Sequence, residues 1–364
     1  MAAQHSIPRW TIALPVLAVI LLGISWGRTL PLWAVLLASV FLAGAVLAAV
    51  HHAEVVAHRV GEPYGSLVLA VAVTVIEVSL IVTVMASGGN QAATLARDTV
   101  FAAVMITTNG IAGACLLLGA LRRRVAVFNP EGTGAAAATV ATLATLSLVL
   151  PTFTTSTPGP QFSVTQLVFA AIASLSLYAL FVATQTVRHR DYFLPVTPEG
   201  RVITEEDHAD PPPTRVALAS LGLLLVALLG VVGLAKAVSP TIEAGVAAAG
   251  LPTSVVGVVI AMLVLLPETL AAVRAARRDR IQTSLNLALG SAMASIGLTI
   301  PTVAIASFWL EGPLVLGLDA THMVLLALTV AMSTLTIIPG RSTPLQGGVH
   351  LAILAAYLVL AVNP

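Results

Sequence analysis

Each of two long apolar stretches of this chain carries one glutamate deep inside. Glu77 lies within residues 61–83, GEPYGSLVLAVAVTVIEVSLIVT, and Glu268 lies within residues 253–273, TSVVGVVIAMLVLLPETLAAV. A carboxylate at bilayer depth costs roughly 2.5–3.5 kcal/mol on insertion scales. Because the chain carries this cost once in each half, we expect both carboxylates to be functional. We therefore expect Glu77 and Glu268 to form one site for a cation or for protons.

The residues beside each glutamate favour the same interpretation. Thr74 precedes Glu77 by three positions, so its hydroxyl shares a helix face with the carboxylate. Pro267 precedes Glu268, lacks an N–H and clashes with the carbonyl of Leu263, which predicts a helix break. Unwound backbone inside a membrane is tolerated where it lines a cavity. The structural alternative is a buried glutamate bonded to a neighbour and a kink that serves packing only.

The apolar stretch after each glutamate offers further oxygen ligands. Asn109 lies in the middle of the first, where an amide needs partners. In the second, four hydroxyl residues fall on one helical face, and we expect the middle two to reach the site. For each single hydroxyl, a bond back to its own helix is the alternative. The four are Ser284, Ser291, Ser295 and Thr302.

A histidine-rich stretch, HHAEVVAHR at residues 51–59, precedes the first glutamate helix. Glu54 and His58 are four residues apart and could pair. Because histidine titrates near neutrality, the stretch could give protons access to the site or sense pH. A solvated basic segment is the alternative, and the HExxH pattern of a zinc site is absent from the sequence. Asp319 and His322 form a weaker candidate pair.

The composition predicts an all-α polytopic membrane protein. The chain has 364 residues, of which 58% are hydrophobic and 9% charged, against about 25% charged in soluble domains. Long apolar runs predict eleven transmembrane helices. The first has no cleavage pattern after it, so we expect it to be retained. The eleven spans are 10–27, 31–50, 63–86, 95–119, 134–151, 164–185, 216–237, 252–273, 282–309, 314–337 and 346–362.

The distribution of basic residues predicts the orientation. With the N-terminus in the cytoplasm, 14 of the 17 lysines and arginines fall on the cytoplasmic side and 3 outside. This is the asymmetry of the positive-inside rule. We expect a multi-pass protein of the cell (inner, cytoplasmic) membrane, with the N-terminus cytoplasmic and the C-terminus outside.

The spans divide into two equal groups around one polar segment. Residues 1–30 hold the extra N-terminal helix, residues 31–187 the first five-helix repeat, residues 188–215 a cytoplasmic acidic linker, and residues 216–364 the second repeat. Because five is odd, the two repeats must be inserted in opposite orientations. Inverted repeats of this kind are typical of secondary transporters, with the site at the repeat interface.

The sequence excludes several other energy sources and partners. It contains no Walker loop, GxGxxG motif or nucleophile elbow, so we expect no cofactor and no enzymatic activity. A net charge of +1 gives no reason to expect nucleic acid. The expected partners are the lipid bilayer and inorganic cations, and the sequence leaves the oligomeric state open. The single cysteine, Cys115, allows no disulfide within the chain.

Three segments resemble the bacterial calcium/sodium–proton antiporters of the ChaA type, in the cation/proton exchanger branch of the calcium/cation antiporter superfamily. They are GEPYGSLVLAVAVTVIEVSLIV, RDTVFAAVMITTNGIAGACLLLGALRRR and LPETLAAVRAARRDRIQTSLNLALGSAMASIGLTIPTVAI. The resemblance implies ten core helices in two inverted repeats, one extra N-terminal helix and alternating access. It also implies that Glu77 and Glu268 are the essential glutamates of the two repeats, with Asn109 and the Gly290–Ser291 region brought to the site.

The chain departs from the superfamily pattern beside both glutamates. An asparagine is frequent three residues before each of them, whereas this chain has Thr74 and Leu265. Thr269 stands where a histidine is frequent. Fewer side-chain oxygens are therefore available than in a typical calcium site.

Together these features predict a secondary active cation/proton antiporter. Calcium/proton exchange is the first expectation, with Ca²⁺ and H⁺ as transported substrates and extrusion of the cation from the cytoplasm. The alternatives are exchange of Na⁺ or K⁺ for H⁺ without calcium, a passive cation channel, and an intramembrane metalloenzyme that uses the histidines.

Overall fold

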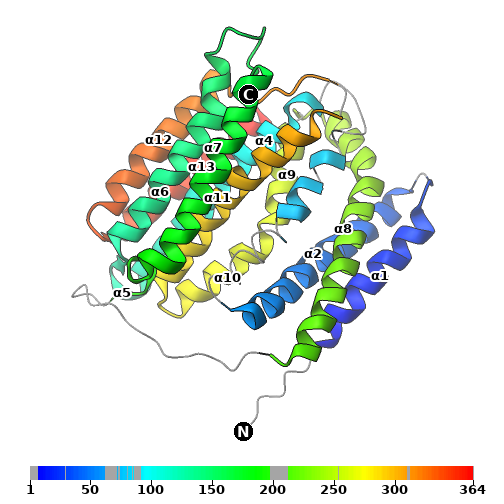
Figure 1. Cartoon of the computed structure of the whole chain (residues 1–364), viewed down its shortest axis with the longest axis horizontal. Helices are drawn as coiled ribbons and strands as arrows, with labels where there is room; N and C mark the ends of the chain where they lie inside the picture. The colour runs from blue at the N-terminus through cyan, green and yellow to red at the C-terminus, as the bar shows by residue number, and fades with distance from the viewer. Residues whose placement is uncertain are drawn as a thin grey trace.

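The computed structural model of this chain describes residues 7–28, 30–61, 72, 74–79, 81–83, 85, 92–196, 212–252, 254–309 and 312–363. These residues are predominantly helical, and the helices run side by side as one bundle (Figure 1). Its labelled helices are α1 (Arg9–Ser25), α2 (Leu32–Val60), α4 (Ala92–Met105), α5 (Ala112–Arg123), α6 (Pro130–Ala144), α7 (Val164–Ala183), α8 (Thr214–Ala248), α9 (Ser254–Val264), α10 (Leu266–Arg277), α11 (Ile281–Ala306), α12 (Ala320–Ile337) and α13 (Pro344–Val362).

Short irregular elements extend or join several of these helices. Three π-helical turns, η1 (Ile106–Ile111), η2 (Thr145–Val149) and η4 (Thr184–Arg188), continue α4, α6 and α7. Two 3₁₀ turns follow, η3 (Leu150–Thr152) and η5 (Arg190–Phe193). The strands β1 (Ala126–Val127) and β2 (Arg341–Ser342) form one short antiparallel pair.

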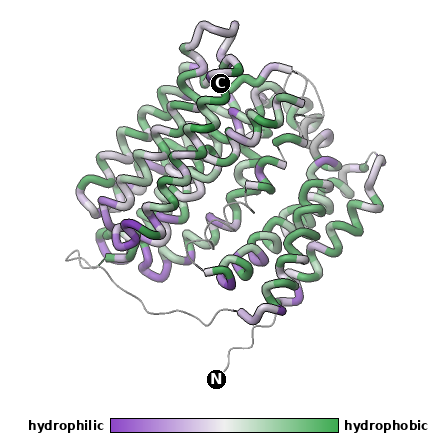
Figure 2. The backbone as a smooth tube through the Cα atoms, in the orientation of Figure 1, coloured by the Kyte–Doolittle hydropathy of each residue, from purple (hydrophilic) through white to green (hydrophobic). Residues whose placement is uncertain are grey.

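The predicted all-α membrane architecture is confirmed. Within the described ranges, eight continuous helices are long and apolar enough to cross a membrane. The pair α9 and α10 is a ninth if it counts as one span, and α1 is a shorter apolar helix. The span predicted over residues 63–86 lies largely outside the described residues, so the count of eleven stays a prediction. Figure 2 shows hydrophobic residues along the helices and hydrophilic ones mostly near their ends.

The helices pack as two hydrophobic bodies. The smaller body consists of α1, α2 and α8, where buried residues such as Ala18, Ala45 and Ala227 meet. The larger body contains α4 to α7 and α9 to α13, and in Figure 1 α9 and α10 lie on its side toward the smaller body. Ile76 and Val264 pack with the smaller body. Because both residues come from the segments that carry the two glutamates, these segments join the two bodies.

Two helices are longer than the sequence predicted. Helix α2 was expected to end at residue 50 but continues to Val60, because neither proline nor glycine occurs from residue 45 to residue 60. The histidine-rich stretch is therefore part of a helix. Helix α8 was expected to end at residue 237 but continues through Pro240 to Ala248. The acidic linker lies mostly outside the described residues.

The segment after α7 is fixed against the start of α6. The Asn286 side-chain amide donates to the Phe193 carbonyl over 2.7 Å, and the rings of Phe181 and Phe193 contact each other. At the start of α6, a Cβ atom on Gly132 would overlap the carbonyl of Tyr192, whereas one on Gly134 would make an ordinary contact.

Gly132→Ala should therefore destabilise the protein, and Gly134→Ala should not. Both changes gain up to about 1 kcal/mol of helix propensity, but overpacking typically costs about 1–3 kcal/mol. Thermal unfolding in detergent should show a lower melting temperature for Gly132→Ala only. Equal melting temperatures for the two variants would contradict the close approach of η5 to α6.

Candidate cation-binding site

Glu77 is buried and receives a hydrogen bond from the other half of the chain. It lies in the helical residues 74–79 and is 2% exposed. The Ser295 hydroxyl of α11 donates to Glu77 Oε2 over 2.9 Å. The other carboxylate oxygen, Oε1, has no partner among the described residues. The two halves of the chain therefore meet at this carboxylate.

Thr299, one helical turn after Ser295, faces the same carboxylate. The Thr299 hydroxyl points toward the Glu77 carboxylate. It makes no hydrogen bond with a residue in the described part of the chain. The sequence analysis missed Thr299. The available signal was its spacing of four residues from Ser295, which places both hydroxyls on one face.

Glu268 lies just after a break in its helix. Helices α9 and α10 meet at an angle of 54°, and Leu265 between them caps the start of α10. This break lies two residues before Pro267, where the sequence predicts one. Glu268 thus occupies the first turn of α10, where the positive end of the helix dipole stabilises a carboxylate. Its own backbone N–H also points to the side chain.

The two glutamates share one region that is rich in oxygen atoms without partners. Glu77 lies close enough to Glu268 for the two charges to interact. In the parts of the chain that the structure describes, the buried oxygens here without a hydrogen-bond partner are Thr74 Oγ1, Glu77 Oε1, Thr299 Oγ1 and Glu268 Oε2. A buried polar atom left unpaired costs about 1–3 kcal/mol. Oxygen atoms without partners are the ligands that a hard cation takes.

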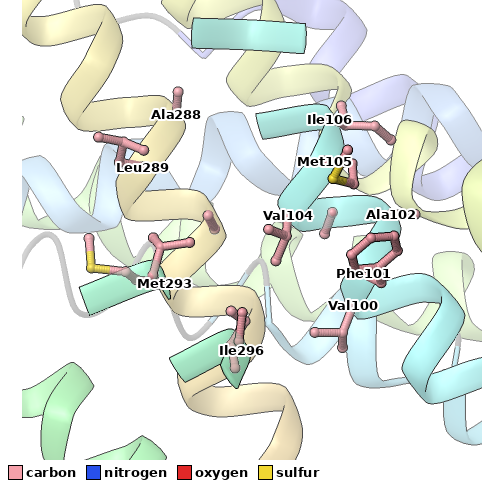
Figure 3. Close-up of a cluster of buried hydrophobic side chains, with 14 of the residues drawn as sticks. Val100, Phe101, Ala102, Val104, Met105, Ile106, Ala288, Leu289, Met293 and Ile296 are labelled. Carbon is pink, nitrogen blue, oxygen red and sulfur yellow. The ribbon is translucent and has the colours of Figure 1, made fainter. Parts of the chain in front are cut away.

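Other residues of the predicted hydroxyl face have other partners. Ser284 donates to the Ala272 carbonyl over 2.8 Å, and Thr302 is exposed and donates to its own helix at Leu298. Ser291 is half-buried, one turn before Ser295. Apolar side chains pack α11 against α4 and η1 and hold the face in place; Figure 3 labels Val104 and Met105 across from Leu289, Met293 and Ile296.

The side-chain amide of Asn109 is hydrogen-bonded at both ends in this structure. Its Oδ1 lies 2.9 Å from Nδ1 of His350, and its Nδ2 donates to Thr329 Oγ1 over 2.9 Å. Both ends of the amide therefore have partners on α12 and α13. Its place among the cation ligands stays a prediction.

Glu54 lies between a cavity and the glutamate site. A cavity of about 400 Å³ is lined by His51, Glu54 and His58 of α2, together with residues at the starts of α1 and α8. The charge of Glu54 also acts on Glu268, and the charge of Arg274 acts on Glu54. Across the described ranges, no three His, Cys, Asp or Glu residues are grouped closely enough to hold a metal ion.

Asp319 and His322 do meet, at the start of α12. Asp319 caps the helix by accepting from the His322 backbone N–H, and its other oxygen lies 2.6 Å from His322 Nδ1. Burial alone would raise the pKa of the Asp319 carboxyl, but the hydrogen bonds and charge of His322 hold that pKa below its usual value. This pair closes a helix end and lies apart from the two glutamates.

The model of the sodium/calcium exchanger protein family matches residues 30–187 and 219–363 of this chain. The chain belongs to this family. Sodium-potassium/proton antiporter ChaA of Escherichia coli is 34% identical over 349 residues, which cover 95% of this chain and 94% of that protein. The y4hA protein of Sinorhizobium fredii, provisionally named an ionic transporter, is 46% identical and covers 98% of this chain and 97% of its own length.

Solved structures show the same fold. The structure of native YfkE, a Ca²⁺/H⁺ antiporter protein, superposes with a TM-score of 0.70 at 17% identity and covers 98% of this chain and 99% of its own. At this identity the match establishes the fold alone. The resemblance to ChaA-type antiporters is confirmed, and the protein is a multi-pass member of a transporter family.

Because Thr299 faces Glu77 and Thr302 faces outward on the same helix, the two threonines form a matched pair. Thr299→Val should raise the Ca²⁺ concentration needed for half-maximal thermal stabilisation of the detergent-solubilised protein. Loss of one bond to a charged group is worth about 1.5–3 kcal/mol, or roughly ten- to a hundredfold in affinity. Thr302→Val should leave the Ca²⁺ midpoint unchanged. Equal shifts of the Ca²⁺ midpoint in both variants would show that Thr299 does not contribute to the site.

Proposed function

We propose that this protein is a cation/proton antiporter of the cytoplasmic membrane in which Glu77 and Glu268 bind either a metal cation or protons. The observation that carries the proposal is a pair of interacting carboxylates, one from each half, each with an enclosed oxygen that has no partner among the described residues. Membership of the exchanger family supports it.

The exchange follows from the cost of charge inside the membrane. A buried carboxylate without a counter-charge is strongly unfavourable, so each glutamate needs either a proton or a cation. A cation that enters the site displaces protons, and protons that return displace the cation. Since the two states compete for the same oxygens, one ion is released when the other binds.

Calcium is the first candidate for the exchanged cation. Ca²⁺ takes six to eight oxygen ligands. Two carboxylates, Thr74, Ser295 and Thr299, together with Ser291 and backbone carbonyls near the break at Leu265, offer most of such a set. The charge of the two carboxylates also matches one divalent cation or two protons.

Sodium or potassium is the second candidate. Thr269, beside Glu268, donates to the Leu265 carbonyl over 2.7 Å, so its hydroxyl proton is used within its own helix. Helices α9 and α10, which carry Glu268, then contribute few other side-chain oxygens. The 34% identical relative ChaA is named a sodium-potassium/proton antiporter. A smaller ligand set of this kind suits a monovalent cation.

The two hydrophobic bodies offer a route to alternating access. The body of α1, α2 and α8 touches the rest through the segments of Ile76 and Val264. A displacement of this body against the larger one would open the glutamates to one side and close them to the other. With the N-terminus in the cytoplasm, inward proton flow would extrude the cation.

Everted membrane vesicles with an acid interior and a pH-gradient dye test this function. Addition of Ca²⁺ should restore dye fluorescence as protons leave, and Glu77→Gln and Glu268→Gln should each abolish the response. Glu131→Gln, at the exposed start of α6, is the matched control and should respond like the wild type.

The cation that elicits the response identifies the substrate. A response to Na⁺ or K⁺ alone would assign a monovalent substrate and keep the mechanism. Ion movement without proton movement would indicate a channel. Intact exchange in both glutamate variants would refute the paired site.

We also propose that Glu54 and His58 form the cytoplasmic access to the site. Glu54 lines the cavity and acts electrostatically on Glu268. Glu54→Gln should raise the cation concentration for half-maximal exchange while the maximal rate changes less, because the charge that attracts the cation is lost. Glu131→Gln again serves as the control. A lower maximal rate at unchanged half-maximal concentration would contradict this role.

A further inference from the structure

A second buried polar cluster lies in the larger body, apart from the glutamates. Asn109, Thr329, Thr336 and His350 are each at most 4% exposed. They come from η1, α12 and α13. Their hydrogen bonds run in one chain, from Thr336 Oγ1 to His350 Nε2 (3.2 Å), from His350 Nδ1 to Asn109 Oδ1 (2.9 Å), and from Asn109 Nδ2 to Thr329 Oγ1 (2.9 Å).

The hydrogen-bond pattern fixes the protonation of His350. Asn109 Nδ2 donates to Thr329 and, over 3.3 Å, to Thr108, so Asn109 Oδ1 must be the acceptor that faces His350. In the neutral ring, which burial inside a membrane bundle favours, His350 Nδ1 therefore carries the proton and Nε2 accepts from the Thr336 hydroxyl. Both ring nitrogens are paired.

The backbone is shaped to bring His350 to Asn109. A Cβ atom on Gly113 of α5 would lie 2.7 Å from the Cβ of His350. A Cβ atom on Gly347 of α13 would lie 2.6 Å from the backbone nitrogen of Leu117. Only glycine at both positions allows α5 and α13 to approach this closely. Gly347 and His350 are three residues apart, so the approach and the histidine share one face.

Asn109 belongs to a π-helical turn that packs against two helices carrying residues of the candidate site. η1 contacts α13 on one side, and it also contacts α10, which carries Glu268, and α11, which carries Ser295 and Thr299. Turns of this type are rare and occur frequently at functional sites. The bond from His350 to Asn109 ties this turn to α13.

We propose that His350 is a positioning residue for cation binding: through Asn109 it fixes the π-helical turn against which the helices of Glu268 and Ser295 pack. This inference rests on the proposed exchange function. It assigns His350 no contact with the cation. Its contribution is to hold the π-helical turn in the position in which the helices of Glu268 and Ser295 bind the cation.

The test measures cation-dependent exchange in proteoliposomes together with the melting temperature. His350→Ala should raise the KM for the exchanged cation about tenfold, with a smaller change in maximal rate. His350→Gln can donate to Asn109 and accept from Thr336, so it should restore most of the wild-type KM. Thr336→Val keeps the bond to Asn109 and should change KM less than twofold.

A double-mutant comparison separates positioning from general stability. Because His350 acts through Asn109, the variant with both His350→Ala and Asn109→Ala should have the KM of the single variants rather than the product of their effects. An unchanged KM in His350→Ala, whatever its melting temperature, overturns the proposal. So does a His350→Gln variant as impaired as His350→Ala.

Two further measurements cover the case in which His350→Ala does not fold and the case in which the protein shows no exchange. If His350→Ala does not fold, Thr329→Val loosens Asn109 from its other end and should raise KM; an unchanged KM would overturn the proposal. Wild-type exchange and its loss in Glu77→Gln are measured first. Failure of that step refutes the exchange function itself, whereas failure of the His350 variants alone refutes only the positioning role.

Discussion

Two carboxylates inside a membrane bundle are the constraint on which the rest of this structure depends: Glu77 is buried, and Glu268 is half-buried with one oxygen enclosed. Neither glutamate can remain charged there without a counter-charge, and no lysine or arginine is close enough to form an ion pair with either in the described structure. Glu77 is instead met by Ser295 from the opposite half of the chain. Each half therefore completes the environment of the other, and neither half forms the site alone.

The break between α9 and α10 serves the same constraint. It places Glu268 in the first turn of a helix, where unpaired backbone N–H groups favour negative charge. It also leaves irregular backbone beside the site. The segments of both glutamates touch the smaller hydrophobic body, so the two carboxylates lie near the contact between the two bodies. In the proposed mechanism, ion binding acts on this contact.

The two halves use their polar residues differently despite their similar plan. The second half sends hydroxyls from α11 to Glu77, whereas the amide of the first half, Asn109, is bonded to His350 and Thr329. The amide thus holds the turn η1 to α12 and α13, while α11 supplies the hydroxyl that meets Glu77.

The sequence by itself determined the membrane architecture, the two buried glutamates and the break near Pro267. These features follow from local chemistry, because hydropathy over about twenty residues and the missing N–H of proline act wherever the segment lies. The sequence also placed Ser295 on the correct helical face. It could not tell Ser295 and Thr299 from Ser284 and Thr302, nor could it direct Asn109 to His350. A helical face runs the full depth of the membrane, and only the packing of distant helices decides which part of it meets a carboxylate.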